Sequence, residues 1–267
     1  MTHSDPASLL PHIVALARRA GEEILQVYAS DFAVSDKADR SPLTAADLRS
    51  HALIARELGA LTPHIPVMSE EGSAIPFAQR RHWERHWLVD PLDGTKEFLA
   101  RNGEFTVNIA LIERHRPVLG VVHVPVSATT YYGTSTGGAW RSDGVEAPRR
   151  IHVQTPAPSR LRVVGSRSHA TDTLTERLAR LGEHELMPIG SSLKFCLVAE
   201  GRADLYPRFG PTSEWDTAAA HAVVEAAGGG VCTTTGEPLL YNVEESLLNP
   251  SFIAYGDRSR DWAALLG

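Results

Sequence analysis

Two aspartates stand three residues apart in the segment Trp87-Leu-Val-Asp90-Pro-Leu-Asp93-Gly94-Thr95. The apolar residues 87–89 predict a buried strand, and the Gly-Thr pair after Asp93 predicts a turn into a short helix. Carboxylates at the end of a buried strand are costly unless a positive charge neutralises them. Magnesium prefers carboxylate and carbonyl oxygens, and the amide N–H groups at a helix start attract anions. The segment therefore predicts a metal ion beside a phosphate.

One acidic turn alone carries little weight, because Asp-Pro and Asp-Gly are common turn dipeptides. Three further acidic sites also lie at the end or start of a predicted element: Asp47, the pair Glu70-Glu71, and Asp216. An acid in the first turn of a helix, as at Asp47 and Asp216, can also simply compensate the helix dipole. Converging carboxylates, however, repel one another without counter-charges. Two or three Mg²⁺ ions would neutralise them, and two ions about 3.5–4 Å apart suit phosphoryl displacement.

The composition restricts the partners of the protein. The chain has 267 residues, 43% of them hydrophobic, which suffices for one large domain or two packed ones. A net charge of −6 disfavours binding to nucleic-acid polymers and leaves a small anionic substrate, held by metal and a few basic side chains. We expect no transmembrane segment, no secretory signal and no disulfide framework. A cytoplasmic setting follows, with peripheral attachment at the inner face of the cell membrane left open and the oligomeric state unspecified.

The hydrophobic pattern predicts two unlike halves. In the first half, helices are followed by a mostly antiparallel sheet, and in the smaller second half strands and helices alternate. Helices are predicted over 7–28, 44–60, 173–181, 191–201, 215–227 and 261–266. Strands are predicted over 63–69, 87–89, 105–112, 117–124, 129–133, 139–141, 161–165, 204–206 and 252–255. The Gly- and Pro-containing stretch 142–160 suggests a division into an N-terminal metal-binding α+β subdomain, 1–155, and a C-terminal α/β subdomain, 156–267, that completes the substrate site.

Three segments resemble the signatures of the inositol monophosphatase-like superfamily of Mg²⁺-dependent, lithium-sensitive phosphatases: Glu70-Glu71-Gly72, Asp90-Pro-Leu-Asp93-Gly94-Thr95 and Trp215-Asp216-Thr-Ala-Ala. The resemblance spans essentially the whole chain and implies a layered α/β/α/β/α sandwich of the sugar-phosphatase type. Lys96-Glu97 and several second-half segments are most similar to the bacterial 3′(2′),5′-bisphosphate nucleotidases of sulfur assimilation. This similarity implies hydrolysis of the 3′-phosphate of adenosine 3′,5′-bisphosphate to AMP and phosphate, with 3′-phosphoadenylyl sulfate as a second candidate substrate.

The resemblance also implies a role for each matching residue. The implied Mg²⁺ ligands are Glu70, Asp90, the Leu92 carbonyl, Asp93 and Asp216, and of these Glu70, Leu92, Asp93 and Asp216 would also line the substrate site. Asp47 and Thr95 would orient or deprotonate the attacking water, with Glu71 near a weaker metal site. The amides of Gly94 and Thr95 would hold the scissile phosphate. The nucleotide, including its 5′-phosphate, would be contacted by His169, Ser191, Lys194 and Arg208.

Several alternatives stay open at this point. On the same fold, the chain could be an inositol monophosphate or fructose 1,6-bisphosphate phosphatase. An aspartyl-nucleophile phosphatase would need an Asp-x-Asp spacing, and the step from Asp90 to Asp93 is one residue longer. A protein that senses nucleotide or metal without catalysis is an alternative of another class. Without the resemblance, Lys194 would be interpreted as a surface residue of an amphipathic helix and Arg208 as a partner of Glu214.

Overall fold

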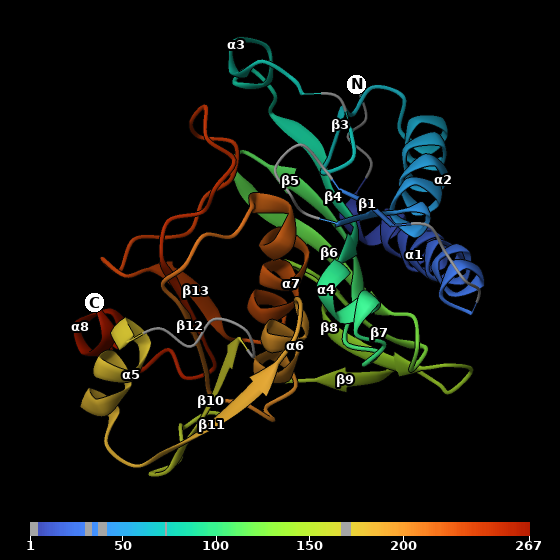
Figure 1. Ribbon diagram of the computed structural model, residues 1–267. Coiled ribbons are helices and arrows are strands. Elements are labelled where there is room, and N and C mark those ends of the chain that lie inside the picture. Colours follow the sequence, from blue (N-terminus) through green and yellow to red (C-terminus); the bar gives the residue numbers. More distant parts are fainter. Residues whose placement is uncertain (1–4, 30–33, 37–41, 73, 167–171) are drawn as a thin grey trace.

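The computed structural model describes residues 5–29, 34–36, 42–72, 74–166 and 172–267. These residues form five layers, in the order helices, sheet, helices, sheet, helices (Figure 1). The three helical layers are α1 (Pro6–Tyr28) with α2 (Ala45–Leu61), then α6 (Leu193–Ala199) with α7 (Glu214–Ala226), then α5 (Asp172–Leu178) with α8 (Trp262–Leu266). The layered sandwich expected from the resemblance is thereby confirmed.

The larger sheet has seven strands in the order β3-β4-β5-β6-β7-β8-β9, so its strands follow one another in space as they do in sequence. Neighbouring strands are antiparallel except for the parallel pair β3 and β4. Its strands are β3 (Val67–Ser69), β4 (Arg85–Asp93), β5 (Thr106–Glu113), β6 (Arg116–Val124), β7 (Thr129–Thr134), β8 (Gly138–Asp143) and β9 (Arg149–Ile151). The tight β5–β6 connection is formed by Arg114 and His115, both with positive φ, as suits a two-residue hairpin turn.

The smaller sheet has five strands in the order β11-β10-β12-β14-β13 and mixes parallel with antiparallel pairs. Its strands are β10 (Leu161–Ser166), β11 (His184–Ile189), β12 (Leu205–Arg208), β13 (Gly230–Thr233) and β14 (Phe252–Tyr255). The remaining elements are the ribbon of β1 (Val34–Asp36) and β2 (Pro42–Thr44), the short helices α3 (Phe77–Arg80) and α4 (Thr95–Leu99), and the 3₁₀ turn η1 (Ala179–Leu181). None of the helices in the described part of the chain is long and apolar enough to cross a bilayer.

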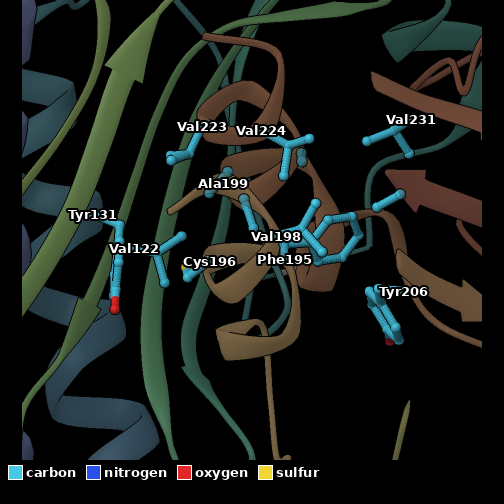
Figure 2. Packing of buried hydrophobic residues seen from close by; sticks show 14 of the residues in the cluster. Val122, Tyr131, Phe195, Cys196, Val198, Ala199, Tyr206, Val223, Val224 and Val231 are labelled. Carbon is cyan, nitrogen blue, oxygen red and sulfur yellow. The ribbon is translucent and has the colours of Figure 1, made fainter. Parts of the chain in front are cut away.

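Helices α6 and α7 fill the space between the sheets. In Figure 2, Cys196 of α6 lies toward Val122 of the larger sheet, while Phe195 lies toward Tyr206 of the smaller one. The Phe195 and Tyr206 rings meet edge to face with centroids 5.0 Å apart. Separate apolar clusters join α1 and α2 to the outer face of the larger sheet, and α5 and α8 to the outer face of the smaller one. The central cluster therefore ties the two sheets into one body.

The strand that carries the acidic segment is longer than the sequence predicted. The prediction that it ends at Val89 was wrong, because β4 stays paired with β5 as far as Asp93. Asp90 pairs with Asn108 and Asp93 with Thr106, and the register shifts between these two pairs. A bulge accommodates Pro91 there, since a proline has no N–H for a regular ladder. Beyond the strand, Gly94 has φ 94° and turns the chain into α4, so the predicted short helix is confirmed.

The division of the chain near residue 155 stays a prediction. The larger sheet uses residues up to Ile151, and the smaller sheet begins at Leu161. Helices α6 and α7 nevertheless come from the second half and pack on both sheets. The two sheets thus share one set of central helices.

Candidate active site

The end of β4 and the first turn of α7 bring two of the predicted carboxylates to one cavity. Asp93 and Asp216 lie in its wall, although 123 residues separate their numbers in the sequence. The cavity has a volume of about 160 Å³ and is lined by Asp93, Gly94, Lys96, Glu97, Ser191, Ser192, Lys194, Phe195, Tyr206, Arg208, Pro211, Thr212, Asp216 and Thr217. One side of the cavity is therefore acidic, and three basic residues also line it.

Asp90, Asp93 and Asp216 each accept hydrogen bonds through one carboxylate oxygen. The Leu92 N–H donates to Asp90 Oδ1 over 3.0 Å, and the Ser213 N–H donates to Asp216 Oδ2 over 2.9 Å. Asp93 Oδ2 accepts the Ser192 N–H over 2.6 Å. The second oxygen of each aspartate accepts no hydrogen bond from the part of the chain that the structure describes. Three oxygens thus remain available to a cation.

The acids are close enough to perturb one another. Asp90 is 1% exposed, and burial raises its pKa well above the usual range. Repulsion from other carboxylates adds to this shift in the pKa of Asp90, in decreasing order from Glu70, Asp93, Asp216 and Asp47. Burial and the neighbouring Asp93 likewise raise the pKa of Asp216. Acids from α2, the segment after β3, β4 and α7 therefore lie near enough to influence the pKa of Asp90.

The chemistry of this donor set fits a divalent cation. Buried, mutually repelling carboxylates are unfavourable without a counter-charge, and hard cations bind such oxygens. Among the described residues, no three acidic, histidine or cysteine side chains already meet at one ion-sized point. The carboxylate side chains would therefore have to move to surround an ion. The predicted ligand set stays a prediction: Glu70, Asp90, the Leu92 carbonyl, Asp93 and Asp216.

The basic side of the cavity contains Lys194, which is only 7% exposed. Its Nζ donates to the Ser191 carbonyl over 2.6 Å and lies 5.4 Å from the centre of the Tyr206 ring. Burial is the main cause that lowers the pKa of Lys194 to about 8; the charge of Asp93 opposes this shift and the positive charge of Arg208 adds to it. The interpretation of Lys194 as a surface residue was therefore wrong.

Arg208 stands at the end of β12 and also lines the cavity. Its Nη2 donates to the Pro211 carbonyl over 3.0 Å, and its buried Nε has no hydrogen-bond partner within the described ranges. Glu214 instead accepts the Asn242 N–H through both oxygens, each over 2.9 Å. The alternative pairing of Arg208 with Glu214 was therefore wrong, and an arginine N–H remains for an anion.

Close backbone approaches shape the mouth of the cavity. A Cβ on Gly190 would lie 2.7 Å from Glu97 Cγ, and the Gly190 N–H donates to Glu104 Oε2 over 2.7 Å. Thr95 begins α4 directly after Gly94, and the next residue of the cavity wall, Lys96, is exposed. The loop that carries Ser191 therefore packs directly on the segment that carries Gly94 and Thr95.

The other predicted site residues have varied positions. Asp47 is buried in the first turn of α2, and Glu70 and Glu71 follow β3 and are half-buried. His169 lies outside the described residues. The sequence reasoning missed Ser192, Asn108 and Thr106, whose side chains all lie within hydrogen-bond distance of Asp93 Oδ2. No local sequence pattern indicates that the polar residues of β5 point at Asp93.

Comparisons with known proteins agree with this geometry. A sequence profile of the inositol monophosphatase family matches residues 5–262. The protein named 3′(2′),5′-bisphosphate nucleotidase CysQ of Salmonella typhimurium is 55% identical over 247 residues, which cover 91% of this chain and 98% of the relative. The protein of the same name from Escherichia coli K12 is 54% identical with the same coverage.

Solved structures show the same relationship. The crystal structure of CysQ from Bacteroides thetaiotaomicron, described as a bacterial member of the inositol monophosphatase family, superposes with a TM-score of 0.79. It is 44% identical, and the match covers 92% of this chain and 95% of that one. The Thermotoga maritima IMPase, at 23% identity and a TM-score of 0.77, shares the fold over 93% of this chain and 92% of its own. The chain therefore belongs to the inositol monophosphatase family.

Proposed function

We propose that this protein is a Mg²⁺-dependent phosphatase that hydrolyses the 3′-phosphate of adenosine 3′,5′-bisphosphate to give AMP and phosphate. The observation that supports this most is the cavity in which Asp93 and Asp216 share a wall with Lys194 and Arg208. Such a site can hold a cation and a second anionic group together. The relatives that are 54–55% identical bear the name of this activity.

Enzymes of this family depend on magnesium, and the acidic side of the cavity suits it. We assign its binding to Glu70, Asp90, the Leu92 carbonyl, Asp93 and Asp216, with two or three ions in the active state. Bound there, Mg²⁺ would supply Lewis-acid activation of the phosphoryl group and of water. The single-oxygen hydrogen bonds to Asp90, Asp93 and Asp216 orient these side chains in advance.

The protein groups perform the remaining tasks. Asp47 and Thr95 orient the attacking water or accept its proton, with Glu71 near a weaker metal site. The Gly94 and Thr95 amides hold the scissile phosphate, which places phosphorus for in-line attack. Lys194 and Arg208, together with Ser191 and His169, hold the nucleotide. A second phosphate on the substrate would account for Lys194 and Arg208 in the wall of this cavity, since an arginine fork matches phosphate oxygens.

The decisive experiment measures phosphate release from adenosine 3′,5′-bisphosphate, inositol monophosphate and fructose 1,6-bisphosphate, each with Mg²⁺ and with EDTA. We expect preference for the nucleotide, dependence on Mg²⁺, and 5′-AMP as the product. Faster turnover of inositol monophosphate would replace the proposal with the sugar-phosphatase alternative. Tight nucleotide binding without release of phosphate would identify a sensor instead.

The course of the reaction has its own test. Direct attack by water inverts the configuration at phosphorus, whereas a phosphoenzyme intermediate gives two inversions and net retention. Hydrolysis of a chirally labelled substrate should therefore show inversion. Retention, or a trapped aspartyl phosphate on Asp90 or Asp93, would revive the aspartyl-nucleophile alternative.

Three finer expectations belong to the same proposal. The sulfated nucleotide 3′-phosphoadenylyl sulfate is a candidate second substrate, and competition with adenosine 3′,5′-bisphosphate measures its affinity. Lithium should inhibit by competing for the cation sites, which a titration at fixed Mg²⁺ tests. A place in sulfur assimilation in the cytoplasm is the physiological setting that we propose, and fractionation of cells tests the location.

A further inference from the structure

A buried serine connects two acids of the site that come from opposite halves of the chain. Ser192 is 2% exposed and precedes α6. Its hydroxyl oxygen lies 2.7 Å from Asp93 Oδ2 and 2.6 Å from the carbonyl oxygen of Asp216. Asn108 Nδ2 donates to the same hydroxyl over 2.8 Å. Because a hydroxyl carries a single proton, Ser192 can serve the two acceptors only alternately.

Helix capping does not account for this serine. A serine at the N-cap normally accepts a backbone N–H from the first turn of its own helix, and Ser192 makes no such bond. The preceding Ser191 has φ 45°, a left-handed conformation that is costly for a residue other than glycine. The chain thus has an unfavourable conformation at Ser191, and the Ser192 side chain makes no capping hydrogen bond. In this arrangement the N–H and the hydroxyl of Ser192 both contact Asp93.

We propose that Ser192 is a positioning residue that fixes the Asp93 carboxylate relative to the first turn of α7, so that Asp93 and Asp216 can share one divalent cation. This inference rests on the proposed function for the identity of the site. The Ser192 donors occupy Asp93 Oδ2, and the Ser213 N–H occupies Asp216 Oδ2. The Oδ1 atoms of both aspartates accept no hydrogen bond from the described residues and would be available to a cation. Ligands held in this way lose less side-chain freedom when the metal binds.

The test is the variant Ser192→Ala, which removes the hydroxyl and keeps the backbone N–H. Calorimetry of Mg²⁺ binding without nucleotide should show a dissociation constant raised by about 10-fold, as is typical when a group that orients a metal ligand is removed. The Mg²⁺ concentration for half-maximal turnover should rise by a similar factor, while kcat at saturating Mg²⁺ should change much less. Loss of a serine that only stabilises the fold would not weaken Mg²⁺ binding while leaving kcat at saturating Mg²⁺ nearly unchanged.

Ser142→Ala is the matched control. Ser142 is 1% exposed, accepts an N–H from Arg18 Nη2 over 2.6 Å, and lies on β8, four strands from β4 in the larger sheet. Its loss should lower the melting temperature without changing Mg²⁺ affinity. If both variants lose similar stability and bind Mg²⁺ as tightly as the wild type, Ser192 has no positioning role.

A second variant covers the case in which Ser192→Ala does not fold. Ser192→Cys keeps a similar volume and a weak donor, so Mg²⁺ affinity should fall by a smaller factor. Unchanged affinity in this variant would overturn the inference. The calorimetry needs no substrate, so a wild type that binds Mg²⁺ without hydrolysing the nucleotide refutes the proposed function while the Ser192 comparison still stands. A wild type that binds no Mg²⁺ overturns both.

Discussion

Asp90→Asn should make the metal-free protein more stable while it abolishes function. Asp90 is buried among Glu70, Asp93, Asp216 and Asp47, and burial and these charges raise its pKa. An asparagine has the same shape and keeps an oxygen for the Leu92 N–H, which donates to Asp90 Oδ1 over 3.0 Å. The substitution therefore removes the repulsion and preserves the local hydrogen bond.

The size of the effect follows from the electrostatics. With an ordinary pKa of 3.8 in the unfolded chain, a raised pKa in the fold costs at most about 4 kcal/mol at pH 7, at about 1.36 kcal/mol per pH unit. The repulsion of a single carboxylate at about 5 Å is worth about 3 kcal/mol at an effective dielectric constant near 20. We expect a gain of about 2 kcal/mol in the free energy of unfolding, or roughly 4–8 °C in a chain of this size. Because the folded pKa is raised, the penalty in the wild type grows as the pH rises from about 4 towards 7.

Thermal unfolding at pH 7 in EDTA and in excess Mg²⁺ measures this effect. Mg²⁺ should stabilise the wild type and not the variant, so the order of the two melting temperatures reverses between the two buffers. Asp204→Asn is the control, because Asp204 is equally buried but pairs with Arg162 over 2.7 Å. This control should lose stability in both buffers. An Asp90→Asn protein that is less stable than the wild type in EDTA, or equally stabilised by Mg²⁺, would refute the reasoning.

Three further predictions concern the substrate, acid stability and packing. Lys194→Gln should raise KM for adenosine 3′,5′-bisphosphate by about 10-fold, as loss of one charge-assisted contact implies, with a smaller change in kcat. Since burial lowers the pKa of Lys194 to about 8, kcat/KM of the wild type should fall as the pH rises through 8. If kcat/KM of Lys194→Gln falls over the same pH range, Lys194 is not the group that binds the substrate. Burial lowers the pKa of His86 to about 3, so its contribution to stability is lost as the pH falls from about 6.5 towards 3. Between pH 6.5 and 4, the unfolding free energy of His86→Leu should therefore fall by about 3 kcal/mol less than that of the wild type. An equal fall in both proteins, measured by denaturant titration at each pH, would contradict this prediction. Gly120→Ala would drive a Cβ into the carbonyl oxygen of Ala219 on α7 and should cost about 3 kcal/mol in chemical unfolding, whereas Gly59→Ala, with open space around it on α2, should be neutral or stabilising. Equal effects of the two glycine substitutions would show that α7 can move away from the sheet.

The sequence predicted most elements whose partners lie nearby in the chain. The helical pattern of residues 7–28 corresponds to α1 at Pro6–Tyr28, and the strands on either side of the Glu113–Arg116 connection correspond to β5 and β6. Strands β1, β2, β9, β11 and β13 were missed, and all of them except β11 have only three or four residues. None of the six residues of β11 (His184–Ile189) is buried, so the strand lacks the apolar signal of a buried strand.

For the site, too, local sequence patterns predicted only part of the arrangement. Its acids could be found because each is a charged residue at the end of an apolar run, where burial of a charge needs an explanation. The bulge between Asp90 and Asp93 could not be predicted, since it depends on the register with β5. Ser192 could not be found either. Its hydroxyl meets an aspartate 99 residues away, and only the packing of α6 against the end of β4 brings them together.

The position of α7 between the two sheets has a consequence for how new specificities could arise. The helix presses its small residues onto Gly120 and Gly133 of the larger sheet, while Asp216 stands in its first turn. A shift of this acid would disturb the central apolar cluster, to which α7 contributes, so this wall of the cavity should change slowly in evolution. The neighbouring loop at 209–212, between β12 and α7, has no buried residue and makes none of these contacts with the larger sheet. Exchanging this loop between relatives should redirect substrate choice and leave the ion-dependent chemistry intact.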